Sequence, residues 1–138
     1  METGLVSKNH YLEYIGNYKA MDFVVLFNSG GYRTAYVNVT NTFCDKLDYF
    51  ECDNYIDVHC GFTYKDCRLP FEEQDDTGIT WLGWDYAHYG DKCEPVKAEE
   101  YFGCNEYVLP FSGHLYTLDE VISECKRVID YIERGVHE

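Results

Sequence analysis

The sequence predicts an α+β fold in which a mostly antiparallel sheet of about four to five strands is packed by a C-terminal amphipathic helix. Two observations favour this class: short β-branched and aromatic segments recur along the chain, and one long helical stripe follows Thr117. The chain has 138 residues, the usual size of one domain, with no repeat and no low-complexity linker. We therefore expect a single domain over residues 1–138.

The first twenty residues are ambiguous, and the first clear strand covers residues 22–27, a β-branched and aromatic run. Asn28-Ser-Gly-Gly31 follows, and its adjacent glycines predict a hairpin turn. Residues 32–40 then alternate between two faces, which predicts a second strand antiparallel to the first. One face carries Tyr32, Thr34, Tyr36 and Asn38, and the other carries Arg33, Ala35, Val37 and Val39.

The middle of the chain predicts two more strands separated by loops. Residues 40–54 are polar and predict a long loop, and residues 55–64 predict a third strand with Gly61 at a bulge or close approach. Residues 65–78 are acidic and turn-rich, and residues 79–85 predict a fourth strand. Residues 92–116 predict an irregular stretch with one short strand near 107–109.

The C-terminal helix is the clearest element. Thr117 and Glu120 have the spacing of a capping box, and Gly135 is placed to end the helix. The apolar stripe predicts a helix that packs on the sheet rather than one that docks a partner. The stripe consists of Leu118, Val121, Ile122, Cys125, Val128, Ile129 and Ile132.

Charge and cysteine content limit the function classes. The 25 acidic and 11 basic residues give a formal net charge of −14, which disfavours direct binding of nucleic acid and favours basic partner surfaces. The odd count of seven cysteines, the lack of a signal-peptide pattern and the lack of a long apolar run predict free thiols in a cytoplasm, without membrane contact. No Cys-x-x-Cys occurs, so we expect no structural zinc site, and no cofactor is indicated.

Two segments carry residues suited to chemistry. On the predicted third strand, His59, Gly61 and Thr63 share one face, which gathers an imidazole, a bare backbone and a hydroxyl. The alternative is a half-exposed strand with an incidental histidine. Tyr64 is the last residue of this segment. No zipper pattern or long apolar edge is present, so the sequence predicts no oligomeric state.

The second segment runs from Trp81 to Asp91. Asp85 and His88 are three residues apart, so one side of a turn can hold both, and Asp91 follows a glycine that permits a tight bend. Carboxylates beside imidazoles can form a general base, bind a divalent metal or clamp a polar ligand, and two Asp with two His can fill an octahedral or tetrahedral site. The alternative is a strand-end turn in which both aspartates cap backbone amides.

These two segments together resemble a signature of small uncharacterised phage and prophage proteins. The residues that carry the resemblance are Asp57-Val-His59-x-Gly61-x-Thr63-Tyr64 and Trp81-x-Gly83-x-Asp85-x-Ala87-His88-x-Gly90-Asp91, with residues 30–37 similar to the early strand of those proteins. Their pattern is V-H-G-G-L-T-Y, then W-x-G-F-D-x-A-H-x-G-D, followed by a closing amphipathic helix. The present chain departs from it at Cys60 and Trp84. The resemblance implies a phage setting in a bacterial cytoplasm.

Three hypotheses for the function follow. The first is a binding protein that counters a host defence, either as an acidic inhibitor of a basic, nucleic-acid-binding defence protein (of the anti-CRISPR type) or by sequestering a small nucleotide-like ligand. The second is a small metal-dependent or acid–base hydrolase using the His/Asp cluster. The third is an accessory protein in which the two segments serve stability alone. The expected ligand contacts are His59, Gly61, Thr63, Tyr64, Trp81, Asp85, His88 and Asp91.

Overall fold

The computed structural model describes residues 1–40 and 58–137. Its strands are β1 (Gly4–Ser7), β2 (His10–Tyr18), β3 (Met21–Asn28), β4 (Arg33–Asn38), β5 (Tyr64–Asp66), β6 (Trp81–Asp85), β7 (Gly90–Asp91) and β8 (Gly113–His114). Its helices are α2 (Pro95–Phe102) and α3 (Leu118–His137). The expected loop over residues 40–54 lies almost wholly outside the described residues, as do residues 55–57 of the predicted third strand.

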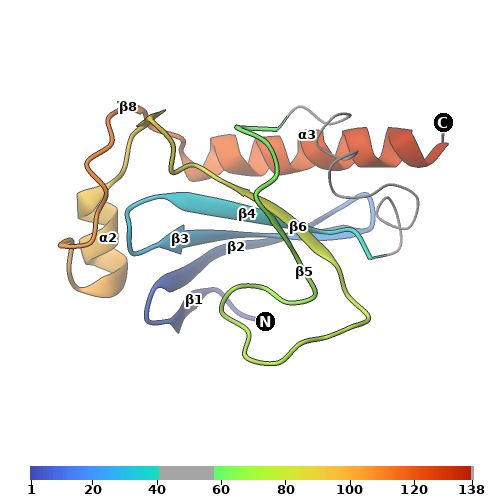
Figure 1. Ribbon diagram of the computed structural model, residues 1–138, viewed down its shortest axis with the longest axis horizontal. Coiled ribbons are helices and arrows are strands. Elements are labelled where there is room, and N and C mark those ends of the chain that lie inside the picture. Colours follow the sequence, from blue (N-terminus) through green and yellow to red (C-terminus); the bar gives the residue numbers. More distant parts are fainter. Residues whose placement is uncertain (41–57, 138) are drawn as a thin grey trace.

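The described strands form one antiparallel sheet in the order β1-β2-β3-β4-β6-β5, and β7 and β8 form a separate short parallel pair (Figure 1). The predicted α+β class is confirmed. The prediction of four to five strands is too low, because the ambiguous first twenty residues contribute β1 and β2 to the sheet. These strands are mostly half-exposed and mix polar with aromatic residues, so they lack the clear alternation of a strand with one buried face.

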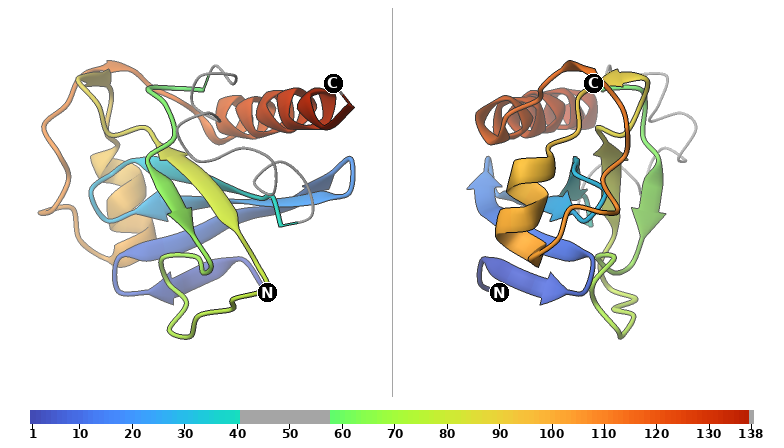
Figure 2. Two further views of the ribbon diagram at one scale, coloured as in Figure 1. Left: turned by 45° about the vertical axis from the view of Figure 1, so that its right-hand side comes forward. Right: turned by 90° about the vertical axis from the view of Figure 1, so that its left-hand side faces the viewer.

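The predicted hairpin of β3 and β4 is confirmed, and so is the alternation along β4. Helix α3 lies along one face of the sheet, where it contacts β2, β3 and β4 (Figures 1 and 2). On that face Ala35 and Val37 join the core beneath the helix, whereas Tyr36 packs in a second apolar cluster on the other face. The segment between β5 and β6 covers this second cluster with the fully buried Leu69.

The predicted helix after Thr117 is confirmed in its start and its packing. The backbone N–H of Glu120 donates to the Thr117 hydroxyl, and the backbone N–H of Thr117 donates to the Glu120 carboxylate, both at 3.3 Å, which forms a capping box. The expected end at Gly135 is wrong, because the helix continues to His137. A glycine inside a helix costs only about 1 kcal/mol, which is too little to stop it. No helix within the described ranges is long and apolar enough to cross a membrane.

Two further expectations need correction. The predicted strand at 107–109 is wrong: the segment turns at Asn105–Val108, and the backbone N–H of Leu109 makes a single bond to Gly30 of the hairpin. Residues 92–116, predicted to be irregular, also contain α2, which begins with Pro95 in its first turn and ends at Gly103 in the left-handed conformation. These are sequence signals of helix termini that the prediction did not use.

The predicted strand over residues 55–64 is wrong in its described part. Residues 58–61 form a turn closed by a hydrogen bond from the Gly61 N–H to the Val58 carbonyl (2.9 Å), and β5 begins only at Tyr64. The reason is local: Cys60 and Gly61 both adopt positive φ, of 56° and 83°, which no strand accommodates. Thr63 still donates its N–H to Gly83 of β6 at 2.9 Å, so the turn stays attached to the sheet.

Candidate functional site

The turn at residues 58–61 presents His59 to the end of β6. A positive φ at the third position of a four-residue turn is the type II pattern, which favours glycine there. This chain has Cys60 at that position. His59 therefore lies on a turn rather than on a strand face, and the short loop projects it toward β7. Its backbone N–H donates to the Glu124 carboxylate of α3 (2.7 Å), which ties the turn to the helix.

The central contact of the site is an imidazole–carboxylate pair between His59 and Asp91. His59 Nε2 lies 3.0 and 2.9 Å from the two carboxylate oxygens of Asp91. The Asp91 side chain is only 5% exposed and that of His59 16%, so the pair is largely shielded from water. A carboxylate held in this way fixes the orientation of the imidazole.

A connected row of polar side chains extends from this pair to the edge of the sheet. His88 Nδ1 lies 3.4 Å from Asp91 Oδ2, and His88 Nε2 lies 3.5 Å from Asp85 Oδ1. Thr63 then donates its hydroxyl to Asp85 Oδ2 at 3.0 Å. The structure thus brings together the five predicted residues His59, Thr63, Asp85, His88 and Asp91.

The structure confirms the capping interpretation of the two aspartates. Asp85 Oδ1 accepts the backbone N–H of Ala87 at 3.2 Å, and Asp91 Oδ2 accepts that of His88 at 3.1 Å, as expected for a capped strand-end turn. The same carboxylates contact imidazoles. Local capping holds the carboxylates in place beside the imidazoles.

The other predicted contacts lie elsewhere or serve the backbone. Tyr64 and Trp81 pack in the apolar cluster on the sheet face away from α3, where the Tyr64 ring meets Tyr36 edge-on and its hydroxyl donates to the Arg68 carbonyl. Gly61 closes the turn beside His59. The structure therefore does not bring Tyr64 and Trp81 to the cluster.

Helix α3 and its approach supply residues that the sequence did not single out. Glu124 accepts the His59 N–H, and its other oxygen accepts the Tyr86 hydroxyl at 3.1 Å. Burial, and next the charge of Glu124, raises the pKa of Tyr86, so this phenol remains a donor. Tyr86 stacks on the His59 ring at a centroid distance of 4.7 Å, and Tyr116 packs beside it at 4.6 Å.

The sequence contains a signal for one of these residues, Tyr116. Tyr116 directly precedes the helix cap, where an apolar side chain commonly packs back on the first turns of the helix. Glu124 carried none, because only the packing of α3 on the sheet brings it to the turn at His59.

A cavity of about 430 Å³ opens next to the cluster, lined by Tyr116, Asp119, Glu120, Ser123, Glu124 and Arg127. Tyr116 and Glu124 belong both to this cavity and to the surroundings of His59. Three of the six lining residues carry a carboxylate, and Arg127 contributes a cation that lies 3.2 Å from Glu124. The cavity therefore favours neutral or positively charged groups over anions, and Tyr116 contributes an aromatic ring to its lining.

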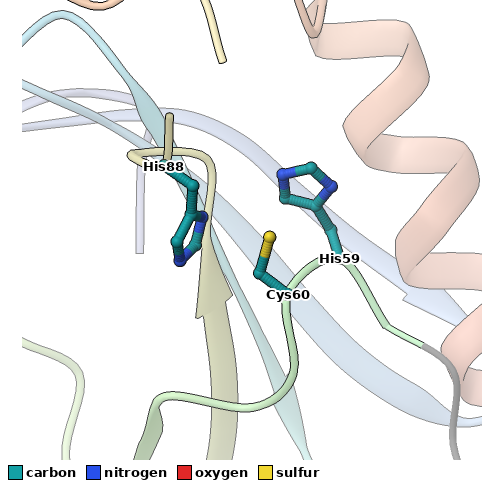
Figure 3. Close-up of side chains that lie close together, drawn as sticks. All are labelled: His59, Cys60 and His88. Atoms are coloured by element: carbon teal, nitrogen blue, oxygen red, sulfur yellow. The ribbon is translucent and has the colours of Figure 1, made fainter. Parts of the chain in front are cut away.

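Three side chains of the cluster can also hold a metal ion. The donor atoms of His59, Cys60 and His88 lie within 4.8 Å of one another, and the Cys60 sulfur points between the two imidazole rings (Figure 3). Burial, followed by the carboxylates of Asp91 and Asp85, raises the pKa of the Cys60 thiol, which disfavours a free thiolate nucleophile. Asp66, Cys67 and Asp75 form a second, more exposed group on β5 and the loop that follows.

The thiols agree with the expectation for cysteines, since Cys60, Cys67, Cys93, Cys104 and Cys125 are all free. Cys44 and Cys52 lie outside the described residues. The site thus combines a shielded His–Asp pair, a second imidazole, a free thiol and a carboxylate-lined cavity. No family model, curated protein or solved structure matches the chain.

Proposed function

We propose that this chain is a binding protein that holds a small polar ligand with a planar ring, such as a nucleoside or nucleotide, beside the His59–Asp91 pair. The observation that carries the proposal is the cavity of about 430 Å³ whose wall shares Tyr116 and Glu124 with the surroundings of His59. A concave site with few convergent polar groups is the usual form of a small-ligand site.

The residues that line the cavity favour the base of such a ligand over its phosphate. Tyr116 offers a ring face on which a base can stack, an interaction worth about 1–3 kcal/mol per base. Asp119 and Glu120 are acceptors suited to the amino groups of a base. The same carboxylates repel phosphate, so any phosphate lies toward Arg127 or solvent. The proposal therefore predicts tighter binding of amino-bearing bases than of uracil, and little gain from added phosphates.

The setting of this activity follows from the resemblance to phage and prophage proteins. A protein that sequesters a nucleotide-like signal in a bacterial cytoplasm deprives a host defence of its messenger. Sequestration requires no turnover, which is consistent with a site whose acidic groups are already engaged in capping and positioning.

Isothermal titration with adenosine, cytidine, guanosine and uridine, and with their monophosphates, tests the proposal. Tyr116→Ala should weaken binding at least about tenfold, consistent with loss of one stacked contact. His59→Ala should weaken it less, because His59 packs on Tyr116 but does not line the cavity. Tyr89→Ala is the matched control, because Tyr89 is 98% exposed and lies outside the cavity lining. Equal binding by the Tyr116 and Tyr89 variants, or no binding of any nucleoside, contradicts the proposal.

The other form of the binding function, an acidic inhibitor of a basic defence protein, uses a different surface. The net charge of −14 and the exposed acidic loop with Glu73, Asp75 and Asp76 favour docking on a basic defence protein. Cleavage of a DNA target by a purified RNA-guided nuclease should then be inhibited at low salt and not at high salt. His59→Ala should leave this inhibition intact, whereas Lys at all three loop positions should abolish it. If His59→Ala abolishes the inhibition and the three Lys substitutions leave it intact, binding is assigned to the cavity.

A hydrolase is the second candidate, and the proximity of the imidazoles favours it. His59 and His88 have ring centroids 5.8 Å apart, close enough to share one substrate or one ion. Turnover of phosphate and carboxylate esters should then require His59 and a divalent metal. Stoichiometric binding of a nucleotide that is recovered unchanged would exclude this candidate for that ligand.

A further inference from the structure

We propose that His59, Cys60 and His88 form a binding site for a transition-metal ion, with Zn²⁺ the ion that fits best. This site lies beside the proposed ligand cavity but does not depend on it, because none of the three side chains lines that cavity. The metal site therefore goes beyond the proposed binding function.

The spacing of the donor atoms is close to that of a coordination sphere. Zn–N bonds of about 2.0–2.1 Å and Zn–S bonds of about 2.3 Å place tetrahedral donors roughly 3.3–3.6 Å apart. The nitrogen and sulfur donors of the three residues lie within 4.8 Å of one another. Small rotations of the side chains bring this set to bonding distance, because Cys60 and His59 lie on a short surface turn and His88 on another.

The chemistry of the donors selects the ion. Two imidazoles and one thiolate suit Zn²⁺ and related ions, whereas Mg²⁺ and Ca²⁺ prefer oxygen ligands. Three protein ligands leave a fourth position for water or an added ligand, the arrangement found in open zinc sites. The thiol loses its proton when the ion binds, so binding releases protons and weakens at low pH.

Neighbouring carboxylates contact the two imidazoles without being among the three donors. Asp91 accepts from His59 and lies 3.4 Å from His88, so one buried carboxylate contacts both imidazoles. A carboxylate bonded to a ligating histidine is the common outer partner that sets the ring orientation. Asp85, 3.5 Å from His88, adds a second negative charge that a bound cation offsets.

Two further features of this place bear on the proposal. The Nδ1 atom of His88 makes no hydrogen bond among the described residues and has only the 3.4 Å contact with Asp91 Oδ2, so it is weakly satisfied. In addition, Cys60 adopts a φ of 56°, which is unfavourable for most residues other than glycine. Lys19 and Ala20 also have positive φ, in the turn between β2 and β3, but at Cys60 the conformation places a sulfur between two imidazoles (Figure 3).

Titration of the reduced, metal-free protein with Co²⁺ tests the proposal. The native chain should bind one equivalent with tetrahedral d–d bands and a near-ultraviolet sulfur-to-cobalt charge-transfer band, and Zn²⁺ should displace the cobalt. Cys60→Gly should abolish the charge-transfer band, and its backbone is compatible with the turn, so the variant should fold. His88→Gln should reduce Zn²⁺ affinity by more than the roughly 10- to 100-fold that loss of an outer partner costs.

Matched variants separate this site from others. Cys67→Ser removes the thiol of the Asp66–Cys67–Asp75 group, and His114→Ala removes an exposed imidazole paired with Glu120, so both should leave the cobalt spectrum unchanged. Asp91→Asn should keep the charge-transfer band while weakening Zn²⁺ binding about 10- to 100-fold. Absence of the band in the native chain, or its loss in Cys67→Ser and not in Cys60→Gly, overturns the proposal.

Discussion

Two groups of buried charges meet at Tyr116 and are built in opposite ways. The Tyr116 carbonyl accepts Arg33 Nη1 at 3.0 Å, and its ring packs on His59. Arg33 belongs to an ion network beneath α2, and His59 to the cluster with Asp91. The two groups differ in how completely their charged and polar atoms are paired.

In the Arg33 network every strong group is matched. Arg33 contacts Glu13 with two nitrogens, at 2.7 and 3.1 Å, and Glu94 with a third contact at 2.8 Å. Tyr101 donates its hydroxyl to Glu13 at 2.7 Å. The side chains of Arg33 and Glu13 are 6% and 2% exposed. A buried, bidentate pair of this kind is engaged within the fold.

In the His59 cluster the matching is incomplete. Two imidazoles face Asp85, Asp91 and the nearby Glu124, and the buried His88 Nδ1 has no hydrogen bond among the described residues. The turn that carries His59 also has a non-glycine residue at positive φ. Unsatisfied polar atoms and backbone strain lower stability, and the described contacts of the Arg33 network show neither.

Arg33→Met provides the largest test of this contrast. It leaves Glu13 charged and buried without its partner, so we expect the free energy of unfolding to fall by about 3–5 kcal/mol in urea denaturation. Adding Glu13→Gln should recover part of that loss, because the uncompensated charge is then removed. A loss below about 1 kcal/mol would show that the network behaves as a solvated surface pair and would break the contrast.

Tyr86→Phe tests the scaffold beneath His59. The Tyr86 hydroxyl accepts the Trp84 indole N–H at 3.0 Å and donates to Glu124, so its removal leaves a buried donor without a partner. We expect a loss of about 1–3 kcal/mol in the free energy of unfolding. Tyr116→Phe is the control, and it should cost less because no hydrogen bond of its hydroxyl supports the core in the described structure. Equal losses would place Tyr86 outside the support of the site.

Cys60→Gly should act in the opposite direction and stabilise the metal-free protein. Relief of the left-handed conformation gains about 1–2 kcal/mol, and the extra freedom of glycine in the unfolded chain returns about 0.5–1 kcal/mol. The net gain of about 0.5–1 kcal/mol should be measurable by urea denaturation in the presence of a chelator. Cys104→Gly serves as the comparison, since Cys104 has no positive φ and should gain nothing. A destabilised Cys60→Gly would mean that the thiol supports the turn.

The sequence was informative where the signal is local. The capping box at Thr117 and Glu120, the stripe on α3 and the hairpin at Gly30–Gly31 each lie within a few residues, and each is confirmed. Asp85, His88 and Asp91 were found for the same reason, since one turn holds all three.

What the sequence could not provide depends on contacts between distant segments. His59 was placed on a strand because Val58–Tyr64 is rich in strand formers, and the positive φ of Cys60 is set by a turn that its side chain does not favour. Glu124 lies 65 positions from His59 in the sequence, so only the packing of α3 on the sheet joins them. Tyr64 and Trp81 fit the motif by spacing, but Trp81 stands at the opposite end of β6 from Asp85 and packs in the apolar cluster on the sheet face away from α3.

The smallest expected effect concerns His10, a histidine outside both charge groups. Burial lowers its pKa below the ordinary value of 6.5, and its Nδ1 lies 2.6 Å from the Ser7 hydroxyl. The unfolded chain then binds a proton at a pH where the folded chain does not. Stability is therefore full above about pH 6.5 and is lost as the pH falls through the lower pKa of the folded state.

His10→Asn should flatten this part of the curve, because asparagine can still accept from Ser7 but does not titrate. The two proteins are compared by their urea midpoints between about pH 7.5 and about pH 5, a range that spans the ordinary histidine pKa. Any pH dependence of the urea midpoint that remains in His10→Asn arises from other groups. Repeating the measurement with Zn²⁺ then shows whether the His59 cluster contributes to it. An unchanged slope in His10→Asn would mean that His10 is solvated in the folded chain, and that the pH dependence arises at other groups.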